Sequence, residues 1–208
     1  MAGRVIPEPY VYPDTPHVRR HGPRGFNDYK RYRPWLRDEF SFRCVYCLER
    51  EVWRDMRDRM HIDHFVPQAI RKDLKCDYSN LLYACPGCNK LKGTKLLPDP
   101  CQLAFGKHLR INEDGSIESI TDDIHGEILI EVLALNDPLT VSSRRRLIGT
   151  LRSLAATDWS LFVEWMRYPQ NLPDLEDKDN RPPDNDKPEG IAQSHFKRDK
   201  RGELPEVY

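Results

Sequence analysis

The sequence predicts an α+β protein in which a small metal-stapled core carries helical N-terminal and C-terminal additions. Two Cys-x-x-Cys pairs, at 44–47 and 85–88, bracket the short stretch "HIDH" at 61–64, which is extended in character. The segments outside these pairs place apolar residues at helical spacing. Because metal ligands gathered by two such pairs can replace a large hydrophobic core, this pattern favours a compact stapled unit with helices packed beside it.

The composition limits the classes of protein that the chain can be. The 208 residues contain 33 Lys and Arg against 33 Asp and Glu, so the overall charge predicts no nucleic-acid partner. The charge is unevenly placed, with a surplus of 7 positive charges in 1–97 and of 7 negative charges in 98–208. This asymmetry favours a polyanion near the N-terminal half, although an ordinary charged surface would give the same counts.

The chain lacks the signals of export and of membrane insertion. It has no run of about 18 apolar residues, and its first 20 residues lack the apolar core of a secretory signal. We therefore expect a cytoplasmic protein. Cysteines stay reduced in that compartment, so its six cysteines indicate metal binding before disulfides.

The chain divides into four predicted parts. Residues 1–26 form an extended arm that lies on another surface, and residues 27–100 form the core with a leading helix. Residues 101–168 form a hairpin and a helical C-terminal region. Residues 169–208 form a polar tail with little to bury, which we expect to be disordered or ordered by a partner.

The leading helix is expected within 27–42, "NDYKRYRPWLRDEFSF". Pro34 lacks a backbone N–H, so the helix either contains a proline or restarts there. Trp35, Leu36 and Phe40 would then share an inward face.

A hairpin and three helices are expected after the core. The hairpin is "LRINEDGSIESI" (109–120), which turns at Asp-Gly. The helices are expected at 122–135, which stops at the Asn-Asp-Pro sequence of 136–138, at 142–156 and at 158–167. The apolar residues expected to face the core are Ile124, Ile128, Val132, Leu135, Leu147, Ile148, Leu151, Leu154, Ala155, Trp159, Phe162 and either Trp165 or Met166.

The two Cys-x-x-Cys pairs have the spacing of zinc knuckles. The four thiols of Cys44, Cys47, Cys85 and Cys88 predict a closed, structural Cys₄ zinc site. An iron–sulfur centre and a redox-active pair are the alternatives. A Cys₄ zinc has no open coordination position, so the chemistry must lie elsewhere. Cys76 and Cys101 are interpreted as packing residues.

The stretch between the pairs contains candidate chemical groups. Alternate residues of a strand share a face, so His61 and Asp63 point to one side and His64 to the other. A helix is expected at 88–96, opening at the second pair. Its first turn would aim Asn89 towards the strand.

Together, "CVYC … HIDHFVPQ … SNLLYACPGCNKLKG" resembles the HNH (His-Asn-His) endonuclease family and its zinc-stabilised subset. The resemblance covers about residues 40 to 97, a quarter of the chain. It implies a ββα-metal nuclease core. No comparable resemblance is seen in residues 1–35 or beyond about 100.

The resemblance also implies a role for each matching residue. His64 would be the general base that activates a water. Asp63 and Asn89 would bind one divalent ion, Mg²⁺ or Mn²⁺ in preference to zinc. Asn80 would hold the loop that orients His64. Asn89 stands where many relatives have histidine. His61 is an addition to the motif, and its alternative roles are a third metal ligand, a phosphate contact, or a residue that only supports the ligands or lies at the surface.

Two groups of charged residues have alternative roles. Lys90, Lys92 and Lys95 suit contacts with the DNA backbone, although a solvated basic face is the alternative for each. The alternating charges in "WRDMRDRMH" (53–61) favour local ion pairs over DNA contact.

Three functions compete at this stage. The first is a metal-dependent endonuclease, a hydrolase of phosphodiester bonds in DNA. The second is a zinc-ribbon module that binds nucleic acid or protein without cutting. The third is a redox-active protein. For the first we expect a nuclease subunit of a larger bacterial defence assembly, with a protein partner such as an ATPase or a sensor; a free-standing restriction or homing nuclease is the alternative.

Overall fold

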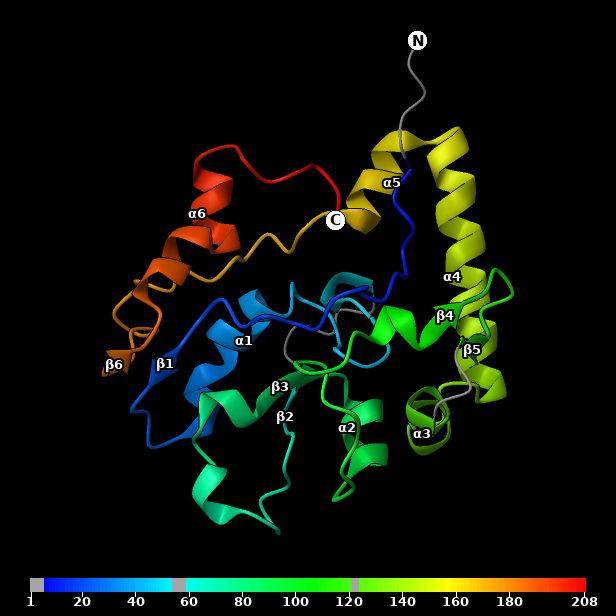
Figure 1. Cartoon of the computed structure of the whole chain (residues 1–208). Coiled ribbons are helices and arrows are strands. Elements are labelled where there is room, and N and C mark those ends of the chain that lie inside the picture. The colour runs from blue at the N-terminus through cyan, green and yellow to red at the C-terminus, as the bar shows by residue number, and fades with distance from the viewer. Residues whose placement is uncertain (1–5, 54–58, 121–123) are drawn as a thin grey trace.

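The computed structural model describes residues 6–53, 59–120 and 124–208. Within these ranges the chain combines helices with small two-stranded antiparallel sheets (Figure 1). The predicted α+β class is thereby confirmed. No helix in the described ranges has the length and apolar content to cross a membrane. The predicted ion pairs around residues 54–58, and the start of the predicted helix at 122 and 123, fall outside the description.

The centre of the fold is a hairpin followed at once by a helix. Strand β2 (His61–His64) pairs antiparallel with β3 (Leu81–Ala84), so that His61 lies opposite Ala84 and His64 opposite Leu81. Helix α2 (Pro86–Lys92) starts directly after β3. This is the ββα arrangement that the family resemblance implies.

Helix α2 differs from the predicted range of 88–96. It begins earlier because Pro86 fits the first turn of a helix, where no N–H is needed. It ends earlier because Gly93 adopts a positive φ of 53°, which glycine tolerates and which stops the helix.

The leading helix restarts at its proline. A 3₁₀ turn, Tyr29–Tyr32, precedes α1 (Arg33–Glu39), and Pro34 lies in the first turn of α1. Trp35, Leu36 and Phe40 are buried in the core, as predicted.

The predicted hairpin and helices of the C-terminal half are also present (Figure 1). Asp137 caps the long helix by accepting hydrogen bonds from the backbone N–H groups of Leu139 and Thr140. The Asn-Asp-Pro sequence therefore begins this helix, four residues before its predicted start at 142. The preceding helix ends at Val132, three residues before its predicted end and before Asn136 is reached. The bounds are β4 Leu109–Ile111, β5 Ile117–Ser119, α3 Ile124–Val132, α4 Pro138–Thr157 and α5 Trp159–Met166.

The predicted inward faces of these helices are largely correct. Leu135, Ile148, Leu151 and Phe162 are buried, and Met166 rather than Trp165 is the fully buried residue near the end of α5. The prediction for Ile124 is wrong, because its side chain is 62% exposed. It is the first residue described in α3, and the helix buries Gly126 and Leu129 instead.

The N-terminal arm lies on the chain's own core. Tyr10 and Tyr12 are buried, and the Tyr12 hydroxyl donates to the backbone carbonyl of Tyr46 over 2.8 Å. Farther along, β1 (Pro23–Arg24) pairs antiparallel with β6 (Asp184–Asn185). The arm and the distant C-terminal region are thus joined by a small sheet.

The polar tail was expected to be disordered or ordered by a partner, but in the structure the rest of the chain orders it. Beyond β6, helix α6 (His195–Lys200) packs near α1 through Asp38. One oxygen of this buried carboxylate, Oδ1, accepts from the backbone N–H of His195 at 2.7 Å and lies 2.9 Å from its Nδ1. The other, Oδ2, lies 2.7 Å from His21 Nε2. Leu175 is buried in the core, and the Trp35 indole N–H donates to the Asn180 carbonyl over 2.9 Å, so isolated contacts that the polar composition does not reveal also hold the tail.

The contacts of Asp38 and Glu39 predict that acid loosens the N-terminal arm and, through the contact of Asp38 with His195, the tail. Burial alone would raise the pKa of Asp38, but hydrogen bonds from His195 and His21 outweigh it and hold the pKa well below its usual range. Burial likewise opposes ionisation of Glu39, yet His17 and the Arg20 amide lower its pKa to about 2. Both carboxylates therefore stabilise the fold above their unfolded pKa values of roughly 4, and this stability is lost as the pH falls towards 2.

We expect Asp38→Asn to loosen the tail already at neutral pH. Breaking one partner of a buried charged network costs about 3–5 kcal/mol. Limited proteolysis of residues 169–208 and amide hydrogen exchange in α6 would measure the loss. Asp184→Asn is the matched control, because its exposed carboxylate pairs with Arg24 at the surface and accepts from the Asn185 backbone N–H. Equal protection of the tail in both variants would contradict the prediction.

Candidate active site and metal centre

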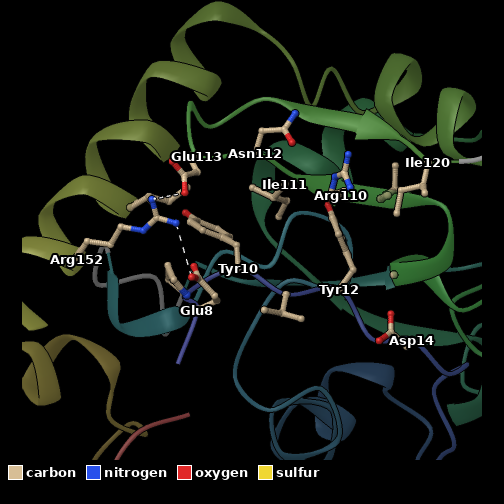
Figure 2. Close-up of a pocket in the computed structure, with 15 residues that line it drawn as sticks. Glu8, Tyr10, Tyr12, Asp14, Arg110, Ile111, Asn112, Glu113, Ile120 and Arg152 are labelled. Atoms are coloured by element: carbon tan, nitrogen blue, oxygen red, sulfur yellow. Dashed lines mark ion pairs between the residues drawn. The ribbon is translucent and has the colours of Figure 1, made fainter. Parts of the chain in front are cut away.

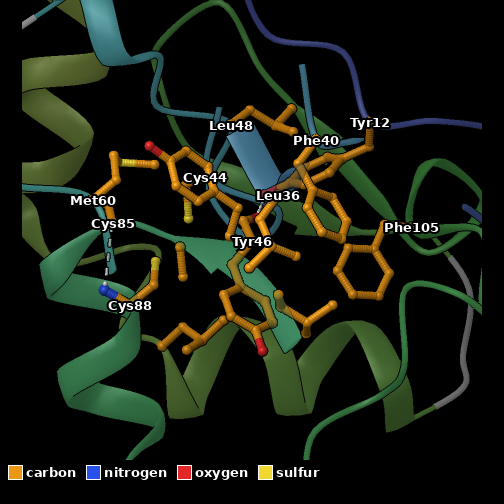
Figure 3. Close-up of a cluster of buried hydrophobic side chains, with 14 of the residues drawn as sticks. Tyr12, Leu36, Phe40, Cys44, Tyr46, Leu48, Met60, Cys85, Cys88 and Phe105 are labelled. Atoms are coloured by element: carbon orange, nitrogen blue, oxygen red, sulfur yellow. Dashed lines mark hydrogen bonds between the residues drawn. The ribbon is translucent and has the colours of Figure 1, made fainter. Parts of the chain in front are cut away.

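The four cysteines of the two knuckles meet at one point. Their sulfur atoms all lie within 4.8 Å of one another, and the sulfurs of Cys47 and Cys85 are 3.7 Å apart. In the first knuckle the chain turns back so that the Leu48 N–H donates to the Cys44 carbonyl. In the second, Cys85 caps α2, and its sulfur accepts from the Cys88 N–H. Figure 3 shows three of the cysteines beside the packed aromatic side chains of the core.

The chemistry of this cluster fits a zinc ion. Hydrogen bonds from Cys44 and Cys47 lower the pKa of Cys85 strongly, whereas the same crowded thiols raise the pKa of Cys88. Four thiolates so close together need a shared cation, and a tetrahedral Cys₄ site is the usual solution for zinc. In the described ranges, no other group of three or more His, Cys, Asp or Glu ligand atoms gathers in this way. Cys76 and Cys101 lie outside the cluster, as expected of packing residues.

His64 ends strand β2 and is held in one orientation. Its Nε2 donates to the backbone carbonyl of Lys75 over 3.0 Å, which leaves the lone pair on Nδ1. The Gln68 amide donates to that Nδ1 over 3.2 Å, and the edge of Tyr29 packs against the ring at 4.8 Å between centroids. Burial lowers the pKa of His64 below its usual value, so the imidazole is neutral at pH 7 and can accept a proton.

Asn80 ties together the loop that follows His64. Its Oδ1 accepts from the Val66 N–H at 2.8 Å, while its Nδ2 donates to the carbonyls of Val66 at 3.1 Å and Leu74 at 3.3 Å. The side chain is buried and its amide is fully used by the backbone. Asn80 is therefore placed to shape the loop between β2 and β3, which contains both hydrogen-bond partners of His64.

Asp63 is more deeply enclosed than its predicted role suggests. It is 4% exposed, and both of its oxygens already accept hydrogen bonds. Oδ2 accepts from the Tyr46 hydroxyl at 2.6 Å, and Oδ1 accepts from the Lys92 ammonium at 3.0 Å. Sequence reasoning missed Tyr46, because a residue between two knuckle cysteines shows no periodicity that reveals where its side chain points.

The predicted DNA contact by Lys92 is wrong. Its side chain is fully buried, and its Nζ donates to Asp63 and, over 2.7 Å, to the backbone carbonyl of His64. It lies on the inner side of α2 because its position, three residues after Asn89, is on the face that packs against β2. Lys90 and Lys95 are exposed, so contact with DNA stays a prediction for these two.

His61 and Asn89 meet at the surface of the same strand and helix. The Asn89 amide donates to His61 Nδ1 over 3.0 Å. Asp63 extends from the same face of β2 as His61, and each of its oxygens keeps a further lone pair. Carboxylate, amide and imidazole are donor groups that suit a divalent ion such as Mg²⁺ or Mn²⁺, so the donor chemistry fits a catalytic ion.

A separate pocket of about 360 Å³ lies between the N-terminal arm, the β4–β5 hairpin and α4 (Figure 2). Arg152 spans it, with ion pairs of 3.1 Å to Glu113 and 3.7 Å to Glu8. None of the candidate catalytic or metal-binding residues lines this pocket. The candidate site, at the junction of β2 and α2, is therefore separate from this pocket.

Comparison with known families supports the assignment of the central segment. Residues 44–95 match the family model described as HNH endonuclease. The resemblance drawn from the motifs is thus confirmed for this segment, which spans a quarter of the chain. The segment contains all the candidate catalytic, metal-binding and DNA-contacting residues, whereas the N-terminal and C-terminal additions lie outside it. No curated protein matches the chain. A segment of this family implies a nuclease, and the four-cysteine cluster beside it fits zinc binding.

Proposed function

We propose that the protein is a metal-dependent HNH endonuclease that hydrolyses phosphodiester bonds in DNA. One observation carries this proposal. His64 lies within the HNH-like segment, its Nε2–H donates to the Lys75 carbonyl, and its Nδ1 is left as a proton acceptor. A histidine fixed in this tautomer, neutral at pH 7, meets the requirement for a general base.

The chain's own residues account for the handling of the attacking water. Nδ1 of His64 takes a proton from this water, which replaces the Gln68 amide as hydrogen-bond partner. Asn80 keeps the loop around His64 in place through its three backbone hydrogen bonds. These contacts hold the base rigid before substrate arrives, which is the condition for efficient proton transfer.

Asp63, Asn89 and His61 would hold the catalytic ion, Mg²⁺ or Mn²⁺. Such an ion, when bound, stabilises the charge on the phosphate and on the leaving 3′ oxygen. The exposed lysines Lys90 and Lys95 would contact backbone phosphates of the DNA.

The finer biological context is also proposed. The C-terminal half carries the surplus of 7 acidic charges and is built of helices, which suits contact with a protein more than with DNA. We propose further that the chain is the nuclease subunit of a larger bacterial defence assembly in the cytoplasm, with a partner such as an ATPase or a sensor. Specific cleavage by the purified chain alone would favour the restriction or homing alternative.

Plasmid cleavage tests the proposed activity. We expect the purified, zinc-loaded chain to nick or linearise supercoiled plasmid with Mg²⁺ or Mn²⁺ and to stop when EDTA is added briefly. Zinc content is measured before and after EDTA, so that loss of activity can be separated from loss of the fold. Binding of DNA without any cleavage, alone and with co-purified partners, would instead support the zinc-ribbon module. Cleavage of RNA but not DNA would overturn the substrate.

A further inference from the structure

Two side chains converge on Asp63, and each comes from one of the two cysteine knuckles. Tyr46 lies between the cysteines of the first knuckle, inside "CVYC". Lys92 is the last residue of α2, the helix that the second knuckle opens at Cys85. The four-cysteine cluster and the candidate site are therefore connected through side chains as well as through the backbone.

The Tyr46 contact is rigid at both ends. The phenol is 1% exposed, and its hydroxyl donates to Asp63 Oδ2 over 2.6 Å. The backbone carbonyl of Tyr46 accepts from the Tyr12 hydroxyl over 2.8 Å, so the N-terminal arm holds the knuckle from the other side. A buried aromatic ring fixed in this way leaves the Asp63 carboxylate little freedom to rotate.

The Lys92 contact supplies charge as well as geometry. Its ammonium is buried, and a buried ammonium requires a counter-charge and full hydrogen bonding. Asp63 Oδ1 supplies the charge, and the backbone carbonyl of His64 accepts a second hydrogen bond. Lys92 thereby links the proposed metal-binding acid to the backbone of the proposed base.

We propose that Tyr46 and Lys92 are positioning residues that fix the Asp63 carboxylate, and that the four-cysteine cluster sets the geometry of the candidate site through them. This inference rests on the proposed function, because it concerns the ion and the base of the same site. The two residues differ in charge. The neutral Tyr46 hydroxyl only orients the carboxylate, whereas the Lys92 ammonium also competes with a divalent cation for it.

The two roles predict opposite shifts in metal affinity. Tyr46→Phe keeps the ring but frees the carboxylate, so Mn²⁺ should bind about 10-fold more weakly, in line with the loss of an outer hydrogen bond at other metal sites. Lys92→Met removes a competing positive charge, so Mn²⁺ should bind more tightly. Both variants should lower kcat, because the carboxylate and the His64 backbone are no longer held together. The KM for DNA should not change, because neither buried side chain reaches the substrate.

The experiment uses the full, zinc-loaded chain. Mn²⁺ affinity is measured by electron paramagnetic resonance without DNA, and kcat and KM are measured by plasmid cleavage. Tyr83→Phe is the matched control. Tyr83 lies on β3, the strand paired with β2, and the variant deletes a buried hydroxyl that donates to Glu51 over 2.5 Å. Lys92→Arg, which keeps the charge, should bind Mn²⁺ as the wild type does. Zinc content and melting temperature show whether each variant folds. If Lys92→Met does not fold, the Mn²⁺ affinity of Tyr46→Phe tests the inference.

Several outcomes would overturn the inference. Mn²⁺ affinity unchanged in Tyr46→Phe would do so, and so would an equal loss in Tyr83→Phe or a change in KM in place of kcat. Failure of the proposed function looks different. If the wild type binds Mn²⁺ through Asp63 but cuts no nucleic acid, the nuclease proposal falls, while opposite affinity shifts in the two variants would still support the positioning roles.

Discussion

Replacing His64 by alanine should lower plasmid cleavage by about 10²–10⁴-fold, the usual contribution of a positioned general base. Nδ1 of this residue is the proton acceptor that the loop between β2 and β3 presents, and alanine leaves the Lys75 carbonyl and the Gln68 amide facing an empty position. The loss should fall on kcat, because the imidazole acts on the water and not on DNA binding. Single-turnover cleavage at saturating protein would measure it.

A second histidine provides the control. His125 is exposed and lies in α3, outside the HNH-like segment, so His125→Ala should cut at the wild-type rate. Zinc content and DNA affinity should be unchanged in both variants. Wild-type cleavage by His64→Ala would mean that another group removes the proton, and His61, at the exposed end of the same strand, would be the next residue to test.

Removing the zinc should have the largest effect on the fold. Structural zinc contributes an apparent 10–16 kcal/mol or so to the folding of small zinc domains, which is as large as the whole stability of a typical domain. We therefore expect Cys88→Ser, or prolonged chelation of the wild type, to abolish the cooperative melting of the core together with cleavage. Circular dichroism melting and zinc analysis would follow the two losses in parallel.

The remaining cysteines separate ligation from a general effect of lost thiols. Cys76→Ser and Cys101→Ser should keep full zinc content and melt near the wild type, because neither thiol belongs to the cluster. The Cys76 sulfur donates to the Asn27 carbonyl over 3.3 Å. A chelated protein that kept its melting transition would show that hydrophobic packing alone holds the core.

The sequence predicted those parts of the molecule whose physical cause lies in local spacing. The four thiols had to come together because two Cys-x-x-Cys turns each bring two sulfurs to one side. The helices followed from apolar residues three and four positions apart, and the β4–β5 turn from Gly115, whose φ is 84°. The early stop of α2 at Gly93 was also visible in principle, as a glycine that ends a helix.

The parts that the sequence did not predict depend on single contacts between distant residues. Lys92 appeared to belong to a basic face with Lys90 and Lys95, and only the packing of α2 on β2 shows that it lies inside, against Asp63. The order of the tail depends on Asp38, which is far from it in the chain. No periodicity encodes such pairs, because one buried charge can select its partner from any segment that reaches it.

The pairing of Pro23 with Asn185 has a consequence for the time course of synthesis. A chain leaving the ribosome at about 5–20 residues per second exposes the cysteine knuckles well before β6 and α6 exist. The zinc-bound segment can close first, while His21 and Asp38 wait for His195 to complete their buried network. The N-terminal arm therefore lacks its final partner for several seconds after emerging. A chaperone or an assembly subunit that reached the nascent chain in this interval would meet a surface that the finished protein no longer offers.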